Sequence, residues 1–172
     1  MLKYLKPFVD IVLWRAGPQD LPGSPLLVLL TLGAYVAVSA LQLVAAGESG
    51  VRILLYLVVD PLLLLGLVWI VLAMFRRRER FAQTASAVLG ACTLLSLLLA
   101  LPLQFLTGAR GPEAAGPVAG FLALVLLVVF VLVISRIVRL ATDGNVFAGL
   151  AVVVTYVLAM ESLASALRPA GS

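Results

Sequence analysis

Residues 53–75 read ILLYLVVDPLLLLGLVWIVLAMF, and residues 76–80 read RRRER. The first stretch carries no charge apart from Asp60. At about 1.5 Å per residue, a helix of this length crosses ~30 Å of hydrocarbon. The arginines that follow end the apolar stretch abruptly, as basic residues do at the boundary of a membrane span. This pattern predicts a transmembrane helix, and its recurrence along the chain predicts an all-α bundle.

Four further apolar blocks of similar length are separated by short polar loops. The predicted spans cover residues 25–46, 53–75, 84–106, 117–135 and 146–167, and together they form one transmembrane domain over residues 25–167. Blocks of this length fit lipid-spanning helices better than barrel strands. Because 63% of the 172 residues are apolar and only 12% are charged, a water-soluble fold is excluded.

Residues 1–24 precede the first span. Lys3, Lys6 and Asp10 fall on one stripe of a helix whose remaining surface is apolar, which is typical of an amphipathic helix that lies in the membrane interface. We expect no cleaved signal peptide, since Pro7 and Asp10 interrupt the apolar run. Residues 17–25, GPQDLPGSP, are rich in helix breakers and predict a connector.

Basic residues are distributed unevenly between the two sides that five crossings define. Lysine and arginine near span ends are retained in the cytoplasm, and nine of the twelve fall on the side that contains the N-terminus. We therefore predict a cytoplasmic N-terminus and an extracytoplasmic tail at residues 168–172, in the inner (plasma) membrane of a bacterium. A missed or invented helix would break the alternation of basic and non-basic loops.

Four polar side chains are predicted to lie within the outer halves of the spans: Asp60, Glu161, Gln42 and Gln104. Both carboxylates are expected about 10 Å below the outer surface, so that they could meet. Burying a carboxylate in hydrocarbon costs free energy, so each of these acids is expected to have a structural or functional role.

Three interpretations of this polar layer are open. Paired carboxylates raise one another's pKa, which would suit a proton or cation site. A protonated Asp60 could instead satisfy a backbone carbonyl that Pro61 leaves unpaired, and Glu161 could reach toward the surface or pair with Arg168. A contact with a partner helix is the third possibility.

The four arginines of the RRRER segment form a predicted cytoplasmic basic clamp: Arg76, Arg77, Arg78 and Arg80. They can act simply as topology determinants, attract anionic lipid, or dock an acidic soluble partner. Rows of small residues at helical spacing, which let helices approach closely, occur at Ala82, Ser86 and Gly90 and again at Thr155, Ala159 and Ser162. Packing within the chain and contact with another subunit both fit these rows.

Catalytic and cofactor motifs are absent from the sequence. The chain has no histidine, and the lone Cys92 lies in an apolar segment, where it is expected to act as a small packing residue. No nucleophile motif or glycine-rich phosphate loop is present. We predict that the protein is not an enzyme and needs no metal or other cofactor. Its basic residues sit at span ends, which argues against nucleic-acid binding.

The five-span arrangement resembles the Yip family of membrane proteins, which are known for interacting with Rab-type GTPases and have bacterial relatives. Asp20, Leu21, Gly23 and Pro25 approach the family's D-L-x-G-P element, with Ser24 inserted. Two further segments are similar in style, Arg80-Phe81-x-Gln83-Thr84 and residues 136–145. The resemblance implies a non-enzymatic membrane protein that acts through partners. It does not imply Rab binding, because the N-terminal region here is short.

These features predict a non-enzymatic scaffold or accessory subunit that contacts the lipid bilayer and other membrane proteins or copies of itself. The alternative is a small proton- or cation-coupled transporter that uses the Asp60 and Glu161 layer. Lipid handling by the N-terminal helix and the basic loops is a third hypothesis.

Overall fold

The computed structural model describes residues 2–48, 50–108 and 116–166. These residues are helical without strands and include five segments long and apolar enough to cross a membrane, which confirms the all-α fold class and makes the chain a multi-pass membrane protein. The helices are α1 (Leu2–Val12), α2 (Pro25–Ala45), α3 (Gly50–Met74), α4 (Phe81–Leu95), α5 (Leu101–Gly108), α6 (Gly116–Ala141) and α7 (Val146–Ala166).

The third span is composite. Helix α4 passes into a π-helical segment, Ser96–Ala100, which leads into α5. About half of this span, 56% of its apolar window, is buried, against 11% for α2, so α4 is the central helix. Small residues such as Ser86, Gly90 and Ala91 make this possible, because they let neighbouring helices approach the α4 backbone closely.

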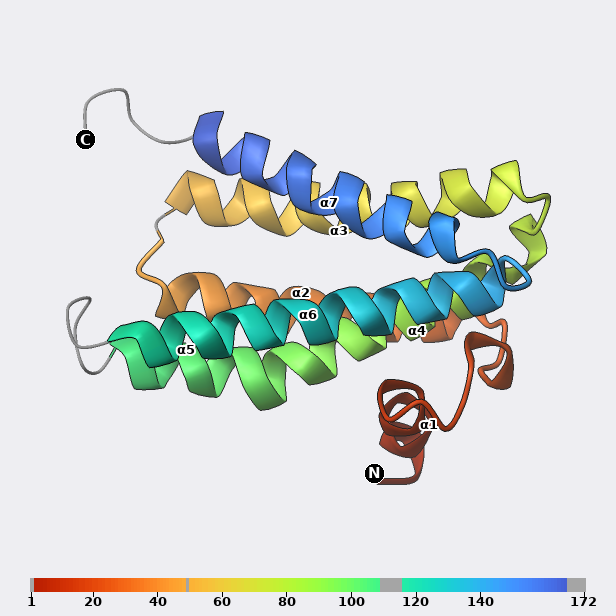
Figure 1. Ribbon diagram of the computed structural model, residues 1–172, viewed down its shortest axis with the longest axis horizontal. Helices are drawn as coiled ribbons and strands as arrows, with labels where there is room; N and C mark the ends of the chain where they lie inside the picture. The colour runs from red at the N-terminus through yellow and green to blue at the C-terminus, as the bar shows by residue number, and fades with distance from the viewer. Residues whose placement is uncertain (1, 49, 109–115, 167–172) are drawn as a thin grey trace.

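The long helices form two layers (Figure 1). Helices α3 and α7 lie together in one layer, and α2, α4, α5 and α6 make up the other. The α3–α4 turn, which contains residues 76–80, and the α6–α7 turn lie at the same end of the bundle, called here the arginine-rich end. Buried apolar side chains are concentrated toward this end, as Leu64, Val68 and Leu72 of α3 and Ile137 of α6 illustrate.

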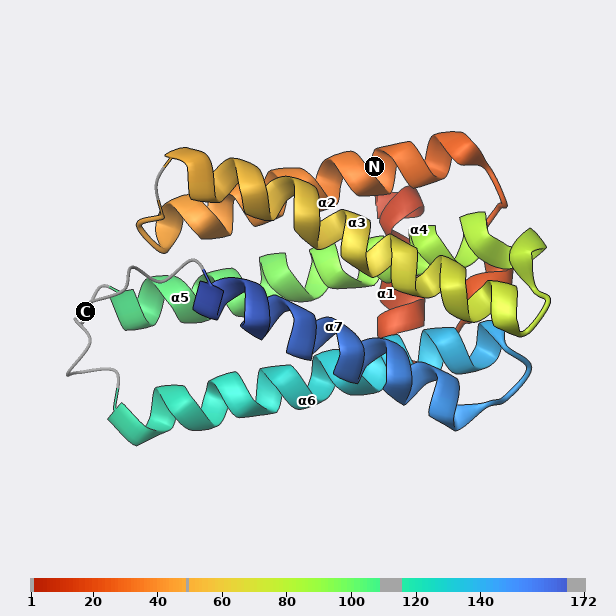
Figure 2. The ribbon, with the colours of Figure 1, turned by 90° about the horizontal axis from the view of Figure 1, so that it is seen from above.

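Helix α1 lies across the long helices, nearer the arginine-rich end, and packs against α4 and α6 (Figures 1 and 2). Its apolar face is buried through Phe8 and Ile11. Phe8 covers Gly90 of α4 so closely that a Cβ at Gly90 would collide with the phenyl ring. The amphipathic N-terminal helix is thus fixed to the bundle by a specific contact.

Arg136 of α6 holds the end of α1. Its guanidinium donates hydrogen bonds to the carbonyl oxygens of Trp14 at 2.9 Å and Ala16 at 3.0 Å, and it lies over the Trp14 ring. The sequence predicted that the fourth span ends at residue 135, but α6 continues to Ala141. The helix thus extends beyond the predicted apolar span, and Arg136 in this extension contacts the backbone at the end of α1.

The connector between α1 and α2 is folded onto the start of α4. The backbone N–H of Gly17 donates to Oδ2 of Asp20 at 2.7 Å, which closes a short 3-10 turn, Pro18–Asp20. Leu21 is buried, and its carbonyl accepts a 3.0 Å hydrogen bond from Nε2 of Gln83. The connector and the first turn of α4 therefore form one packed unit.

The two rows of small residues differ in burial. Ser86 and Gly90 are buried in the bundle, with Ala82 half-buried, whereas Thr155 and Ser162 of α7 are exposed. The close approach of α6 and α7 depends on a glycine outside both rows. A Cβ at Gly149 would collide with the backbone of Ser135, so these helices touch backbone to backbone.

Candidate functional site

Asp60 lies on α3 and is buried at the level where the two layers meet. Its Oδ2 accepts a 2.6 Å hydrogen bond from the hydroxyl of Tyr35 on α2, and its Oδ1 accepts a very short one from the hydroxyl of Tyr156 on α7. The carboxyl group therefore joins three of the long helices. It lies about 15 Å along α3 from Gly50, which is deeper than the sequence predicted, because α3 begins earlier than expected.

The sequence context of Asp60 suits this role. Asp60 and Pro61 are both buried, and α3 continues through Pro61 without a break. The hypothesis that Asp60 satisfies a carbonyl freed by Pro61 differs from the observed arrangement, in which both carboxyl oxygens accept from tyrosines on other helices. Buried tyrosine hydroxyls usually find a partner, and here both share one carboxyl group.

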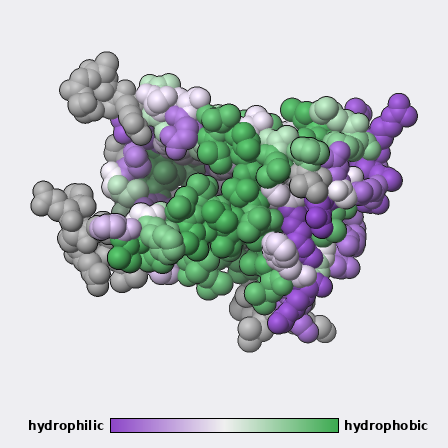
Figure 3. Space-filling model, viewed as in Figure 1, coloured by the Kyte–Doolittle hydropathy of each residue, from purple (hydrophilic) through white to green (hydrophobic). Residues whose placement is uncertain are grey.

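A cavity of about 470 Å³ opens beside Asp60. It reaches Ala46 at the end of α2, so it extends from the middle of the bundle toward the end opposite the arginines. Figure 3 shows the surface hollowed where the two layers separate at this end. Its polar lining comes from Tyr35, Ser39, Gln42, Tyr56, Asp60, Ser96, Gln104 and Tyr156, and its apolar lining includes Phe130 and Met160.

The π-helical segment of the third span contributes to this cavity. Ser96 and Ala100, at its two ends, both line the wall. An inserted residue widens the helical turn and changes the direction of the side chains that follow, and such segments are frequent at functional sites. Gln104, one helical turn beyond Ala100, also faces the cavity and donates a 3.0 Å hydrogen bond to the carbonyl of Gln42.

The structure brings together three of the four polar residues that the sequence singled out. Asp60, Gln42 and Gln104 line one cavity, but Glu161 is exposed on α7 and is not part of the lining. Glu161 follows Tyr156 by five residues, which turns it about 140° away around the helix. The structure therefore does not place Glu161 with Asp60 in this cavity, and Tyr156 contributes the hydroxyl that contacts Asp60 from α7.

The tyrosines are the residues of the candidate site that the sequence did not single out. Tyr35, Tyr56 and Tyr156 all line the cavity, and Tyr35 and Tyr156 fall near the middle of predicted spans, whereas Tyr56 lies three residues from the start of its span. Tyrosine is usually found at the membrane–water interface. Its presence in the middle of a span was a usable signal that the hydroxyl has a partner inside the bundle.

The cavity carries a single potential charge. Asp60 is the only Asp, Glu, Lys or Arg among its described lining residues, and the structure places no cation within ion-pair distance of it in that part of the chain. The described residues contain no group of three or more His, Cys, Asp or Glu that could hold a metal ion. An ionised Asp60 would give the cavity one negative charge, stabilised by two hydroxyl donors.

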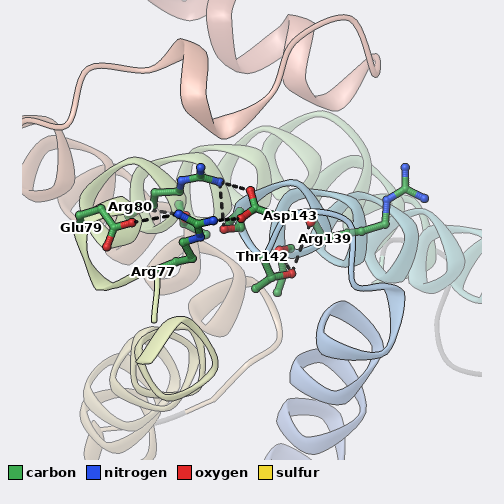
Figure 4. A network of polar contacts seen from close by, with 9 residues as sticks. Arg77, Glu79, Arg80, Arg139, Thr142 and Asp143 are labelled. Atoms are coloured by element: carbon green, nitrogen blue, oxygen red, sulfur yellow. Dashed lines mark hydrogen bonds and ion pairs between the residues drawn. The ribbon is translucent and has the colours of Figure 1, made fainter. Parts of the chain in front are cut away.

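A second polar cluster lies at the arginine-rich end (Figure 4). Arg77 and Arg80 both pair with Asp143 in the α6–α7 turn, Arg80 at 2.8 Å. The hydrogen bond from Arg80 and the charges of Arg77 and Arg80 hold the pKa of Asp143 below its usual value. The cluster ties together two turns that are distant in sequence.

The predicted basic clamp is therefore divided. Arg77 and Arg80 are engaged by Asp143, and Arg78 lies over the Trp69 ring, 5.4 Å from its centroid. Arg76 is exposed. The segment serves partly as an internal link, which the sequence could not reveal because Asp143 lies in a different loop.

Comparison of the chain with protein-family models, with curated proteins and with solved structures gives no match.

Proposed function

We propose that this chain is a non-enzymatic inner-membrane protein that binds a small monovalent organic cation in the Asp60 cavity, as the binding step of a carrier. The single observation that carries the proposal is a buried carboxyl group with tyrosine donors but no cationic partner among the described residues, set in a cavity. We propose that the N-terminus lies in the cytoplasm. In this orientation the cavity opens away from the cytoplasm.

Cavity size favours a molecular ligand over a bare ion. A water molecule takes about 30 Å³ in the liquid, so the cavity of about 470 Å³ is far larger than a metal ion. It falls within the usual range for small-molecule sites, ~300–1,000 Å³. A ligand with an apolar body and one positive charge would fill this space and place its charge near Asp60.

The lining supports a cationic ligand. Three tyrosines and Phe130 present aromatic rings, and such rings attract ammonium groups, especially where water is partly excluded. Ser39, Gln42 and Gln104 supply hydrogen-bonding groups toward the open end. One acid gives one charge, which favours a monovalent ligand over a divalent metal ion.

The proposal is tested with choline as the probe. Purified protein is titrated calorimetrically with choline and with the uncharged analogue in which carbon replaces the nitrogen. We expect choline to bind and the analogue not to bind, and Asp60→Asn to abolish choline binding. Glu161→Gln, which removes an acid from the same half of the bundle but outside the cavity, is the matched control and should bind normally. Equal binding of both compounds would reject a cation site.

The second candidate function is the scaffold or accessory role, and one observation favours it. Glu161 is exposed on α7 inside a membrane span, beside the exposed Ser162. A lipid-facing carboxyl is costly, and a partner helix would relieve that cost. If this role holds, purification in mild detergent should give a stoichiometric partner or a homo-oligomer that Glu161→Gln weakens. A monomer without a partner would contradict it.

A further inference from the structure

A second, smaller cavity of about 210 Å³ lies between the end of α1, α6 and α7. Arg136, Arg139, Trp14 and Ser135 line its part nearer the arginine-rich end, and Val131, Leu132 and Leu150 supply apolar walls. One site thus combines two guanidinium groups with an apolar surface. It is separate from the Asp60 cavity, with which it shares no described lining residue.

The positive charge at this site is not neutralised within the described residues. Arg136 donates to three backbone carbonyls, those of Ile11, Trp14 and Ala16, all of which are uncharged. The guanidinium of Arg139 makes no ion pair or hydrogen bond with any other described residue, and Figure 4 shows it directed away from Asp143. Asp143 is itself occupied by Arg77 and Arg80, so it is not available to Arg139.

Two like charges three residues apart on a helix repel each other unless an anion lies between or beside them. The site also contains an unused hydroxyl. The Oγ atom of Ser135 is buried and has no hydrogen-bond partner, although buried hydroxyls are normally satisfied. A phosphate group would accept hydrogen bonds from the Arg139 guanidinium and would offset the charge of Arg136.

The apolar walls identify the source of that phosphate. Leu132 and Leu150 are exposed, and the exposed apolar surface continues from them to Val128 and Val154, one turn further from the arginine-rich end. That direction leads into the hydrocarbon, and acyl chains can follow it. A free phosphate ion would use only the basic part of the site.

We propose that this cavity holds one anionic phospholipid, with its phosphate beside Arg136 and Arg139 and its acyl chains along Leu132 and Leu150. In the orientation proposed above, the lipid belongs to the cytoplasmic leaflet, which is rich in anionic headgroups. The lipid contacts both the end of α1 and the α6–α7 pair, so it fills the angle between the interfacial helix and the bundle.

Native mass spectrometry of the purified protein tests this site. The probes are phosphatidylglycerol, phosphatidylcholine of the same chain length, and glycerol 3-phosphate, which has the phosphate without the chains. We expect bound phosphatidylglycerol in preference to phosphatidylcholine, no retention of glycerol 3-phosphate, and a loss of about fivefold in phosphatidylglycerol affinity in Arg139→Gln.

Two further variants keep the test decisive. Arg76→Gln removes an exposed arginine at the same end but outside the cavity, and it should retain phosphatidylglycerol. Leu150→Trp leaves both arginines in place but fills the apolar part, and it should lose the lipid. Equal losses in Arg139→Gln and Arg76→Gln would show general surface attraction and overturn the site. Retention of glycerol 3-phosphate as strong as that of the lipid would show an anion site without a role for the chains, which also overturns the proposal.

Discussion

The hydroxyl of Tyr35 on α2 lies 2.6 Å from Oδ2 of Asp60 on α3, while the other carboxyl oxygen of Asp60 accepts from Tyr156 on α7. The Asp60 side chain thereby links α3 to both α2 and α7. This point marks where the well-packed core of the arginine-rich half ends and the cavity begins. The same contact therefore stabilises the bundle and shapes the candidate site.

Removing either tyrosine hydroxyl should destabilise the bundle. Tyr35→Phe and Tyr156→Phe each leave one carboxyl oxygen of Asp60 without its partner, at an expected cost of about 1 to 3 kcal/mol. Thermal unfolding in detergent measures the effect. Tyr56→Phe is the matched control, because Tyr56 lines the same cavity but shows no hydrogen bond from its hydroxyl in the described structure, and it should unfold close to the parent protein. Equal losses in all three variants would contradict the specific role of the Asp60 contacts.

Adding a methyl group at Gly149 should separate α6 and α7. In Gly149→Ala the new Cβ meets the backbone of Ser135, which cannot rotate away, so we expect a loss of about 1 to 3 kcal/mol. Gly33→Ala on α2 adds the same methyl group where no atom lies within 4 Å and should be neutral or slightly stabilising. The free energy of unfolding of the two variants checks this. A neutral Gly149→Ala would show that the helices are not in backbone contact.

The contact between Phe8 and Gly90 should behave as a coupled pair. Gly90→Ala brings a methyl group against the Phe8 ring, so it should destabilise the packing of α1 on α4. In a Phe8→Ala background the ring is gone, and the same change at Gly90 should have little effect. A double-mutant cycle on unfolding free energy measures the coupling. Additive effects would mean that α1 does not rest on α4 at this position.

The link between the two arginine-rich turns should depend on pH in one direction. The pKa of Asp143 is lowered, chiefly by the hydrogen bond from Arg80 and further by the charges of Arg77 and Arg80. The folded state therefore favours the ionised form. Its stabilising effect is complete above the ordinary carboxyl pKa of about 3.9 and is lost as the pH falls below that value through the lower folded-state pKa.

Comparing the parent protein with Asp143→Asn separates the contribution of Asp143 to the pH dependence of stability from the contributions of the other acids. The parent protein should be the more stable of the two at neutral pH, and the difference in thermal midpoint should disappear as Asp143 is protonated. A difference that stays constant down to the lowest pH at which the protein folds would exclude the ion pairs as its source.

The sequence predicted the all-α class and five apolar helices, because apolar length is a local property of the chain. It predicted less about the site. Asp60, Gln42 and Gln104 were found from their polarity alone, but their tyrosine neighbours were not, because which face of α2 and α7 turns inward depends on packing between helices. Whether Glu161 shares the cavity with Asp60 could not be predicted for the same reason: depth along a helix can be counted in a sequence, whereas rotation about its axis cannot.

Larger departures arise from contacts between segments far apart in the chain. The N-terminal helix was expected to lie in the interface, and its attachment through Phe8, Gly90 and Arg136 adds contacts that no local pattern shows. The engagement of Arg77 and Arg80 by Asp143 is another case, because the two loops are neighbours only after the bundle forms.

The charge and water access of the Asp60 cavity can be measured directly. Ser39→Cys, in a background in which the buried Cys92 is replaced by alanine, places a thiol in the cavity wall for reaction with cationic and anionic methanethiosulfonates of similar size. We expect the cationic reagent to react faster by about tenfold or more, choline to slow it, and Asp60→Asn to remove the preference. No reaction with either reagent, or equal rates that Asp60→Asn leaves unchanged, would contradict a water-accessible cation site.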